Sequence, residues 1–298
     1  MSTKYSTGVR FNHHMGVLES ISFTGEGVGA ALYVIAFVTG QWALGIVGIL
    51  LVFGAVVALL NHLGVPLRSW RAITRVATSW VSRGTSMIGG FLAAATASIL
   101  ALYIAPLQAL QPVLALLAVV FAIPVMIYAG MLLRSMRALR LWRGSFVPLS
   151  FIAHSIATAC VLAWALMHLL GDAALPGWLQ PLALVSLVAA AVLSTMHLML
   201  VERSVGVRAS LERLLKGDLR NGLFLGAGLA GFIVPLVALV VWSGGAPAAL
   251  LVLVAAARLY GDFAYRNAIV IAGAYEPVMP FESHRTHPAA TPVGKARA

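Results

Sequence analysis

Eight long apolar segments are the feature that most constrains how this chain can fold. Each contains about 20 residues or more, which lets an α-helix cross the hydrocarbon core of a bilayer. Only 10% of the 298 residues are charged, whereas a soluble domain carries about 25%. No segment alternates apolar and polar residues as a barrel strand does, so helices are predicted. The expected spans are 17–40, 42–63, 85–106, 109–133, 147–170, 179–201, 221–243 and 246–272.

The predicted fold is an all-α integral membrane protein with eight transmembrane helices. The expected domain boundaries are an amino-terminal tail at 1–16, a membrane domain at 17–275 and a flexible carboxyl tail at 276–298. The membrane domain divides into possible halves at 17–143 and 147–275. In both halves a histidine near a helix end precedes an arginine-rich loop, a weak internal similarity.

Lys and Arg are concentrated in one set of connections. The loops at 64–84, 134–146 and 202–220 hold four, four and five of them, whereas the shorter connections between spans hold none. By the positive-inside rule, the long loops and both termini are predicted to be cytoplasmic. The net charge of +11 therefore indicates topology and contact with lipid, and not nucleic-acid binding.

The chain contains one cysteine, Cys160, in the middle of a predicted span. One thiolate cannot hold an iron–sulfur cluster, which takes about four ligands. There is also no CxxC motif and no second cysteine for a disulfide. If this protein transfers electrons, the metal centres are therefore expected on a partner subunit, or the cofactor is not bound through cysteine.

Ionisable side chains gather in the cytoplasmic half of the predicted bundle. Each costs about 2.5–3.5 kcal/mol on insertion into a membrane, so each needs a reason. In the eighth span Arg258, Asp262 and Arg266 are spaced i, i+4 and i+8 and share one helix face. Polar groups on one side favour a pocket entered from the bilayer over a continuous ion path. The other polar residues in this half are Glu26, His62, Tyr128, His154 and His197.

Quinone reduction is a chemistry that these residue types suit. It takes two electrons and two protons, and it needs hydrogen-bond donors at both carbonyl oxygens and titratable groups nearby. Each residue also has a plain structural interpretation. The Arg–Asp series fits an ion-pair network, Tyr128 an interfacial tyrosine, His62 a helix cap and Glu19 a surface residue. Glu26 lies in a Gly-Glu-Gly-Val-Gly stretch, whose glycines predict close helix packing.

A haem-binding cytochrome is the sharper alternative. His154 and His168 lie 14 residues apart on one predicted helix, a spacing that can place two haems at two depths. Each haem would need a second axial ligand on another helix. His197 or His62 lies at a suitable depth for an inner haem, and no histidine on another span serves the outer one. A single inner haem stays open as an alternative.

A secondary transporter is the other competing class. Transporters often contain broken helices at the midplane of both halves. Pro124 and Pro235 interrupt the fourth and seventh predicted spans, which correspond to each other only loosely. Uptake of a substrate by the protein alone would support a transporter, and a requirement for an iron–sulfur partner would contradict it.

Several segments resemble, in the right order, the polysulfide-reductase membrane-subunit family (NrfD-like). The anchor subunits of dimethyl sulfoxide reductase share a related version. The junction at 61–84, with one His, several Arg and two Trp, is the most specific match. Between the matching segments the likeness is apolar character alone. The other matching segments are 23–30 in the first span, 128–133 followed by Trp142 and Pro148, and 261–266 followed by Gly273.

The resemblance implies two four-helix bundles, with neither haem nor an iron–sulfur cluster on this chain. It implies binding of quinone (menaquinone or ubiquinone) beside a ferredoxin-like iron–sulfur subunit, which itself attaches to a molybdopterin catalytic subunit. In the family a tyrosine of the fourth helix contacts quinone, and Tyr128 matches it. Polar residues early in the first helix also contact quinone. Glu19 and Glu26 are the candidates here, because this helix contains no His.

The expected location is the bacterial inner membrane, with the iron–sulfur partner on the cytoplasmic side where the basic loops lie. The terminal substrate is a property of the catalytic subunit, so no catalytic or metal-binding residue is expected on this chain. Further candidate contacts to quinone are His62, Arg258 and Asp262, and the arginines predicted to dock the partner are Arg68, Arg71, Arg83 and Arg137.

Overall fold

The computed structural model describes residues 9–62, 74–171, 176–241 and 247–275. Eight helical segments in these ranges are long and apolar enough to cross a bilayer, which confirms the predicted all-α membrane fold. The spans are α1 (Val17–Thr39), α2 (Trp42–His62), α3 (Trp80–Tyr103), η2 (Ala105–Leu110) with α4 (Gln111–Ser135), α5 (Phe146–Leu169), α6 (Leu179–Leu200), η4 (Gly222–Ile233) with α8 (Val234–Val241), and α9 (Ala248–Ala272).

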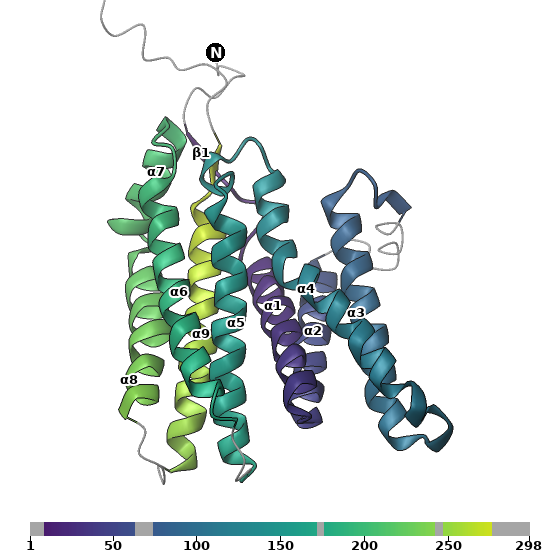
Figure 1. Ribbon diagram of the computed structural model, residues 1–298. Helices are drawn as coiled ribbons and strands as arrows, with labels where there is room; N and C mark the ends of the chain where they lie inside the picture. The colour runs from purple at the N-terminus through teal and green to yellow at the C-terminus, as the bar shows by residue number, and fades with distance from the viewer. Residues whose placement is uncertain (1–8, 63–73, 172–175, 242–246, 276–298) are drawn as a thin grey trace, which may run out of the picture.

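The spans form two groups that meet along a seam (Figure 1). Helices α1 to α4 make one group, and α5, α6, η4 with α8, and α9 make the other. Helix α1 is central, since it packs against α2 and α4 in its own group and against α5 and α9 across the seam. The buried polar side chains of these helices, such as Glu26, His154 and Arg266, therefore face protein rather than lipid.

One span boundary and the winding of one span differ clearly from the prediction. Helix α3 begins at Trp80 instead of residue 85, because the Ser79 hydroxyl caps it by accepting a hydrogen bond from the Ser82 amide at 3.3 Å. The seventh span begins as a π-helix over Gly222–Ile233, a wider winding than the α-helix that its apolar sequence predicted.

The glycines of α1 bring its backbone against neighbouring helices. A Cβ atom on Gly25 would lie 2.9 Å from Ala55 on α2, and a Cβ on Gly29 would collide with the backbone of Gly48. A Cβ on Gly27 would overlap the hydroxyl of Ser155 on α5. The packing role predicted for the Gly-Glu-Gly-Val-Gly stretch is therefore confirmed.

Both ends of the membrane domain meet at the end of the molecule that carries the long basic loops, called the basic end below. Strand β1 (Arg10–Phe11) pairs antiparallel with β2 (Ala274–Tyr275). The short helices η3 (Arg140–Trp142) and α7 (Val205–Leu215) lie beside β2. The Trp142 indole donates to the Ile269 carbonyl of α9 at 2.9 Å, which fixes this loop on the bundle.

Helix α7 is held to the rest of the basic end through Arg213. Its guanidinium makes a two-point ion pair with Asp218 at 2.8 and 2.7 Å and donates to the Ile271 carbonyl at 3.2 Å. It also stacks on the Phe11 ring at 4.6 Å. The hydrogen bond from Arg213 holds the pKa of the Asp218 carboxyl below its usual range. This exposed pair therefore stays ionised at neutral pH.

Candidate functional site

Glu26 is buried in the first group of helices, with 1% of its surface exposed. It lies about 14 Å along α1 from the basic end, at 1.5 Å per residue. The Ser22 hydroxyl, one turn earlier, donates to Glu26 Oε1 at 2.8 Å. Its other oxygen, Oε2, has no hydrogen-bond partner in the described part of the chain. A buried carboxyl oxygen without a partner is costly in a membrane interior, so it needs an explanation such as a bound group or a water molecule.

Tyr128 on α4 lies within electrostatic range of this carboxylate. The side chain is 5% exposed, and no hydrogen bond joins its hydroxyl to any residue that the structure describes. Its ring fills the space beside Gly84 of α3, where a Cβ atom would overlap ring carbons. Glycine at 84 is therefore required for this position of the tyrosine. Helices α1, α3 and α4 together place Tyr128 within electrostatic range of Glu26.

The other predicted quinone contacts near α1 and α2 have different surroundings. Glu19 is buried in the first turn of α1. Its carboxylate accepts a hydrogen bond from the Gly16 amide at 2.7 Å, so it caps the helix. His62 ends α2, and its side chain lies outside the described residues.

The predicted docking arginines are partly described. Arg83 is half-buried, and its guanidinium donates to the carbonyls of Val76 and Ala77 and stacks on Trp80 at 4.8 Å. Arg137 is exposed at the basic end. Arg68 and Arg71 lie outside the described residues. Arg83 therefore organises its own loop, and Arg137 is free to meet a partner.

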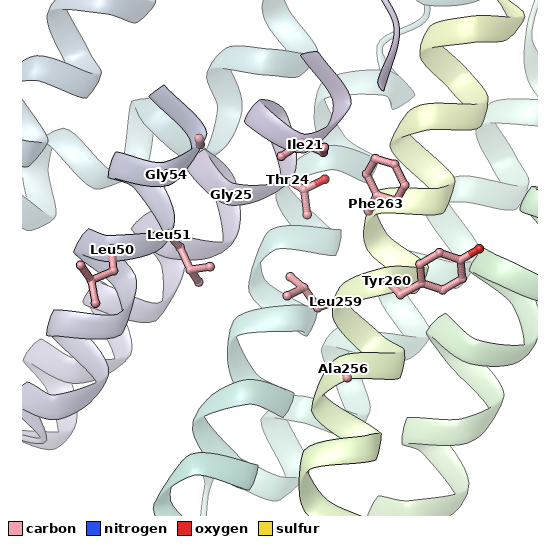
Figure 2. Close-up of a pocket in the computed structure, with 11 residues that line it drawn as sticks. Ile21, Thr24, Gly25, Leu50, Leu51, Gly54, Ala256, Leu259, Tyr260 and Phe263 are labelled. Carbon is pink, nitrogen blue, oxygen red and sulfur yellow. The ribbon is translucent and has the colours of Figure 1, made fainter. Parts of the chain in front are cut away.

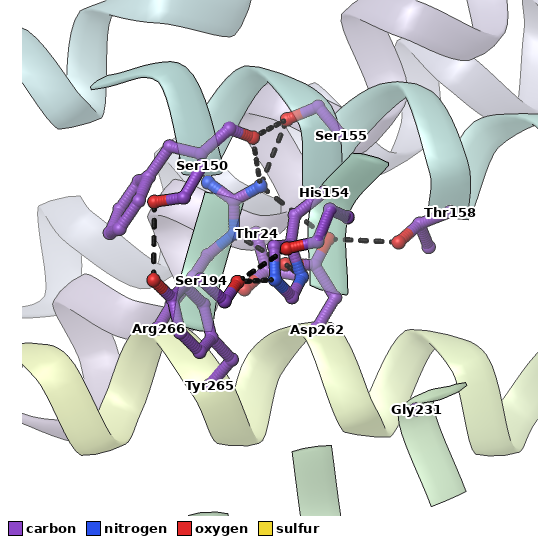
Figure 3. Close-up of polar contacts among 12 residues, drawn as sticks. Thr24, Ser150, His154, Ser155, Thr158, Ser194, Gly231, Asp262, Tyr265 and Arg266 are labelled. Carbon is purple, nitrogen blue, oxygen red and sulfur yellow. Dashed lines mark hydrogen bonds and ion pairs between the residues drawn. The ribbon is translucent and has the colours of Figure 1, made fainter. Parts of the chain in front are cut away.

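A second polar group fills the core between α1, α5 and α9 (Figure 3). Its centre is Arg266, which is fully buried on α9. Arg266 Nε donates to Asp262 Oδ1 at 2.7 Å, and Nη2 donates to the Ser155 hydroxyl at 2.9 Å and to the Phe151 carbonyl at 3.0 Å. Nη1 crosses the seam to the Phe23 carbonyl of α1 at 3.2 Å. The ion-pair interpretation of these α9 residues is thus correct for Arg266 and Asp262.

His154 on α5 extends this network to α6. Its Nδ1 lies 3.4 Å from Asp262 Oδ1, and Nε2 lies 2.9 Å from the Ser194 hydroxyl. Ser194 donates its single hydrogen to the Ala190 carbonyl at 2.7 Å, so it accepts the Nε2 hydrogen of His154. The Tyr265 ring stacks on the imidazole at a centroid distance of 4.3 Å. Both nitrogens and one face of His154 are therefore occupied by protein.

Arg258 does not pair with Asp262, contrary to the expectation that both arginines would form ion pairs with this acid. Its Nη1 donates to the Gly231 carbonyl of η4 at 2.7 Å, and its Nη2 donates to the His154 carbonyl at 3.3 Å. Its Nε has no partner among the described residues, and its carbon Cζ lies over the Phe232 ring at 5.1 Å. The Gly231 carbonyl belongs to the π-helix. The spacing of charged residues on α9 could not predict this acceptor.

A lateral cavity of about 460 Å³ opens between α1, α2 and α9 (Figure 2). Most of its lining is apolar, and Thr24, Tyr260 and Phe263 contribute the few polar or aromatic side chains. Ile21, Thr24 and Gly25 of α1 line this cavity, whereas Glu26 does not. The cavity was missed from the sequence because three helices contribute its walls.

Residues 15–212 match the family model described as DMSO reductase anchor subunit (DmsC). The chain belongs to the DmsC family of membrane anchor subunits. The resemblance to dimethyl sulfoxide reductase anchors is thereby confirmed, while the NrfD-like features remain a prediction. No curated protein matches the chain. The DmsC match includes Glu26, Gly84 and Tyr128 and ends before η4 and α9, so the buried arginines lie outside it.

Proposed function

We propose that this DmsC-family anchor binds membrane quinone, menaquinone or ubiquinone, between α1, α3 and α4. The observation that carries the proposal is the buried Glu26 oxygen without a donor, close to a Tyr128 hydroxyl that makes no described hydrogen bond. A quinone oxygen accepts a hydrogen bond from a tyrosine, and quinone chemistry needs a group that takes up or releases protons. Tyr128 supplies the donor, and Glu26 handles a proton.

The electrons in this proposal pass between quinone and a ferredoxin-like iron–sulfur subunit docked at the basic end. That subunit serves a molybdopterin catalytic subunit. The single cysteine, Cys160, cannot hold a cluster, so the redox metals belong to these partners. Exposed Arg137 at the basic end suits contact with a partner protein. We also propose that this chain carries no haem, because the contacts of His154 leave neither ring nitrogen available for iron.

The proposal predicts that Tyr128→Phe and Glu26→Gln impair quinone-linked turnover of the assembled complex. Phenylalanine keeps the ring against Gly84 but leaves a quinone oxygen without a donor, a loss of about 1–3 kcal/mol. That corresponds to a fall of roughly 5- to 150-fold. Glutamine keeps the shape of Glu26 and cannot carry a proton. Steady-state kinetics with a short-chain quinol analogue measure both effects.

Activity with a soluble dye should stay close to wild type in both variants, because a dye reacts at the partner's own centres. Tyr103→Phe is the matched control, since Tyr103 is 76% exposed at the far end of α3. If Tyr128→Phe and Glu26→Gln both keep wild-type quinone kinetics, the site lies elsewhere. The cavity of Figure 2, with Tyr260 in its wall, would then be the next candidate.

We further propose that the basic end faces the cytoplasm, with the anchor in the bacterial inner membrane. The strand pair β1–β2 supports a common side for both ends of the membrane domain. Reporter fusions after Arg143 and after Gly244 should then give opposite signals, cytoplasmic for the first and periplasmic for the second. A periplasmic signal at Arg143 would overturn both the orientation and the cytoplasmic partner.

A further inference from the structure

The buried charges of α9 do not balance among themselves. Arg258, Asp262 and Arg266 are each fully buried, which places two cations and one anion in the core. Arg266 forms an ion pair with the Asp262 carboxylate. Within the described residues, Arg258 donates to carbonyls and meets no carboxylate at ion-pair distance. Glu26 is the remaining buried acid in the described part of the membrane core beyond the helix-capping Glu19. An ionised Glu26 would bring the count to two of each sign.

Arg266 is the link between this network and Glu26. Its Nη1 donates to the carbonyl of Phe23, three residues before Glu26. Its Nη2 lies 3.5 Å from the place where a Cβ on Gly27, the next residue, would be. The guanidinium thus lies against the α1 turn that contains the acid, and the charges of Arg266 and Glu26 interact. The network contacts α1 at the turn from Phe23 to Gly27, and this turn carries Glu26, the group proposed to handle a proton.

Few other titratable or charged groups face Glu26. Tyr128 faces it from α4, and Ser22 donates to it from α1. On α5 and α9, His154 and Asp262 lie behind Arg266 in the same network. The described residues of α2 add no charged side chain, and Arg83 of α3 is occupied by its own loop. Among the described residues, Arg266 is therefore the cation that acts on Glu26.

We propose that Arg266 is a positioning residue for the quinone site, which fixes the α1 turn and stabilises the negative charge of Glu26. This rests on the proposed function of Glu26. When quinol is oxidised to quinone, it releases two electrons and two protons. The electrons go to the partner's iron–sulfur clusters, one proton goes to Glu26, and the other is released to water. The neighbouring guanidinium then favours release of that proton from Glu26 to water, which readies the carboxylate for the next turnover. Quinone reduction reverses these steps.

The decisive variants separate charge from geometry. Arg266→Gln combined with Asp262→Asn removes the pair without leaving a lone buried carboxylate. In the assembled complex, turnover with a short-chain quinol should fall about tenfold, and its activity–pH curve should move up by about one pH unit. Arg266→Lys keeps the charge, but a lysine ammonium cannot make all the hydrogen bonds of the guanidinium. It should keep the pH curve of wild type and raise the KM for quinol.

A triple variant that adds Glu26→Gln tests whether Arg266 acts through Glu26. At saturating quinol its kcat should be no lower than that of Glu26→Gln alone, because the acid that Arg266 assists is absent. Further slowing, or an unchanged pH curve in the double variant, would overturn the inference. An unchanged KM for quinol in Arg266→Lys would also overturn the inference. This second variant keeps the test valid if the double variant does not assemble. If Glu26→Gln and Tyr128→Phe both leave quinol kinetics unchanged, the proposed function fails instead.

Discussion

Alanine in place of Asp262 is expected to cost the folded anchor about 3–5 kcal/mol, one of the two largest effects that the structure predicts. The carboxylate accepts hydrogen bonds from Arg266 Nε at 2.7 Å and from the Thr158 hydroxyl at 3.0 Å. Its Oδ1 also lies 3.4 Å from His154 Nδ1. Removing it leaves a guanidinium in the membrane core without its counter-charge. The apparent melting temperature of the detergent-purified chain, followed by size-exclusion chromatography after heating, should fall by several degrees or the protein should fail to purify.

Asp218→Ala is the matched control, because it also removes an Arg–Asp pair. The Asp218 side chain is 57% exposed, and its partner Arg213 keeps a contact to the Ile271 carbonyl. Surface pairs of this kind contribute about 0–1 kcal/mol, so its melting temperature should change little. Equal melting of the Asp218→Ala and Asp262→Ala proteins would show that the buried network contributes no more than a surface ion pair.

The sequence predicted the fold because hydropathy and length alone mark a membrane span. Eight spans were expected, and eight helical segments of sufficient length and apolar character are present in the described residues. The glycines around Glu26 were correctly expected to permit close packing, since the absence of a side chain is itself the signal. Boundaries were less certain where a cap decides them, as Ser79 does for α3.

The site was only partly predictable, because its members lie on different helices. The periodicity of α9 placed Arg258, Asp262 and Arg266 on one face, but it could not show which group each would meet. The partner of Arg258 proved to be the Gly231 carbonyl, and His154, considered as a haem ligand, proved to be hydrogen-bonded within the network. Contacts of this kind depend on helix packing and rotation, which apolar sequence does not determine.

The π-helix is the clearest case of a feature set by tertiary contacts. Residues 222–233 are uniformly apolar apart from their glycines, and nothing in their order distinguishes a π-helix from an α-helix. In the structure, Gly231 meets Gly261 of α9 backbone to backbone. The Arg258 guanidinium donates a hydrogen bond to the Gly231 carbonyl at 2.7 Å. The wide winding therefore coincides with the place where α9 needs an acceptor for a buried cation.

Gly261→Leu should consequently be as damaging as the loss of Asp262. A Cβ on Gly261 would overlap the Gly231 backbone, so a leucine must force η4 and α9 apart. Overpacking costs about 1–3 kcal/mol, and the displaced carbonyl would also weaken the hydrogen bond from Arg258, worth about 1.5–3 kcal/mol for a charged donor. We expect a loss of about 3–5 kcal/mol, measured as the same fall in melting temperature.

Gly222→Leu is the control for adding a leucine to this pair of helices. A Cβ on Gly222 has no described neighbour within 4 Å, so the larger side chain should be accommodated with little change in melting temperature. Wild-type melting of the Gly261→Leu protein would mean that the two backbones are not held in contact. The π-helix would then need another cause, because the contact between Gly231 and Gly261 is what places its carbonyl within reach of Arg258.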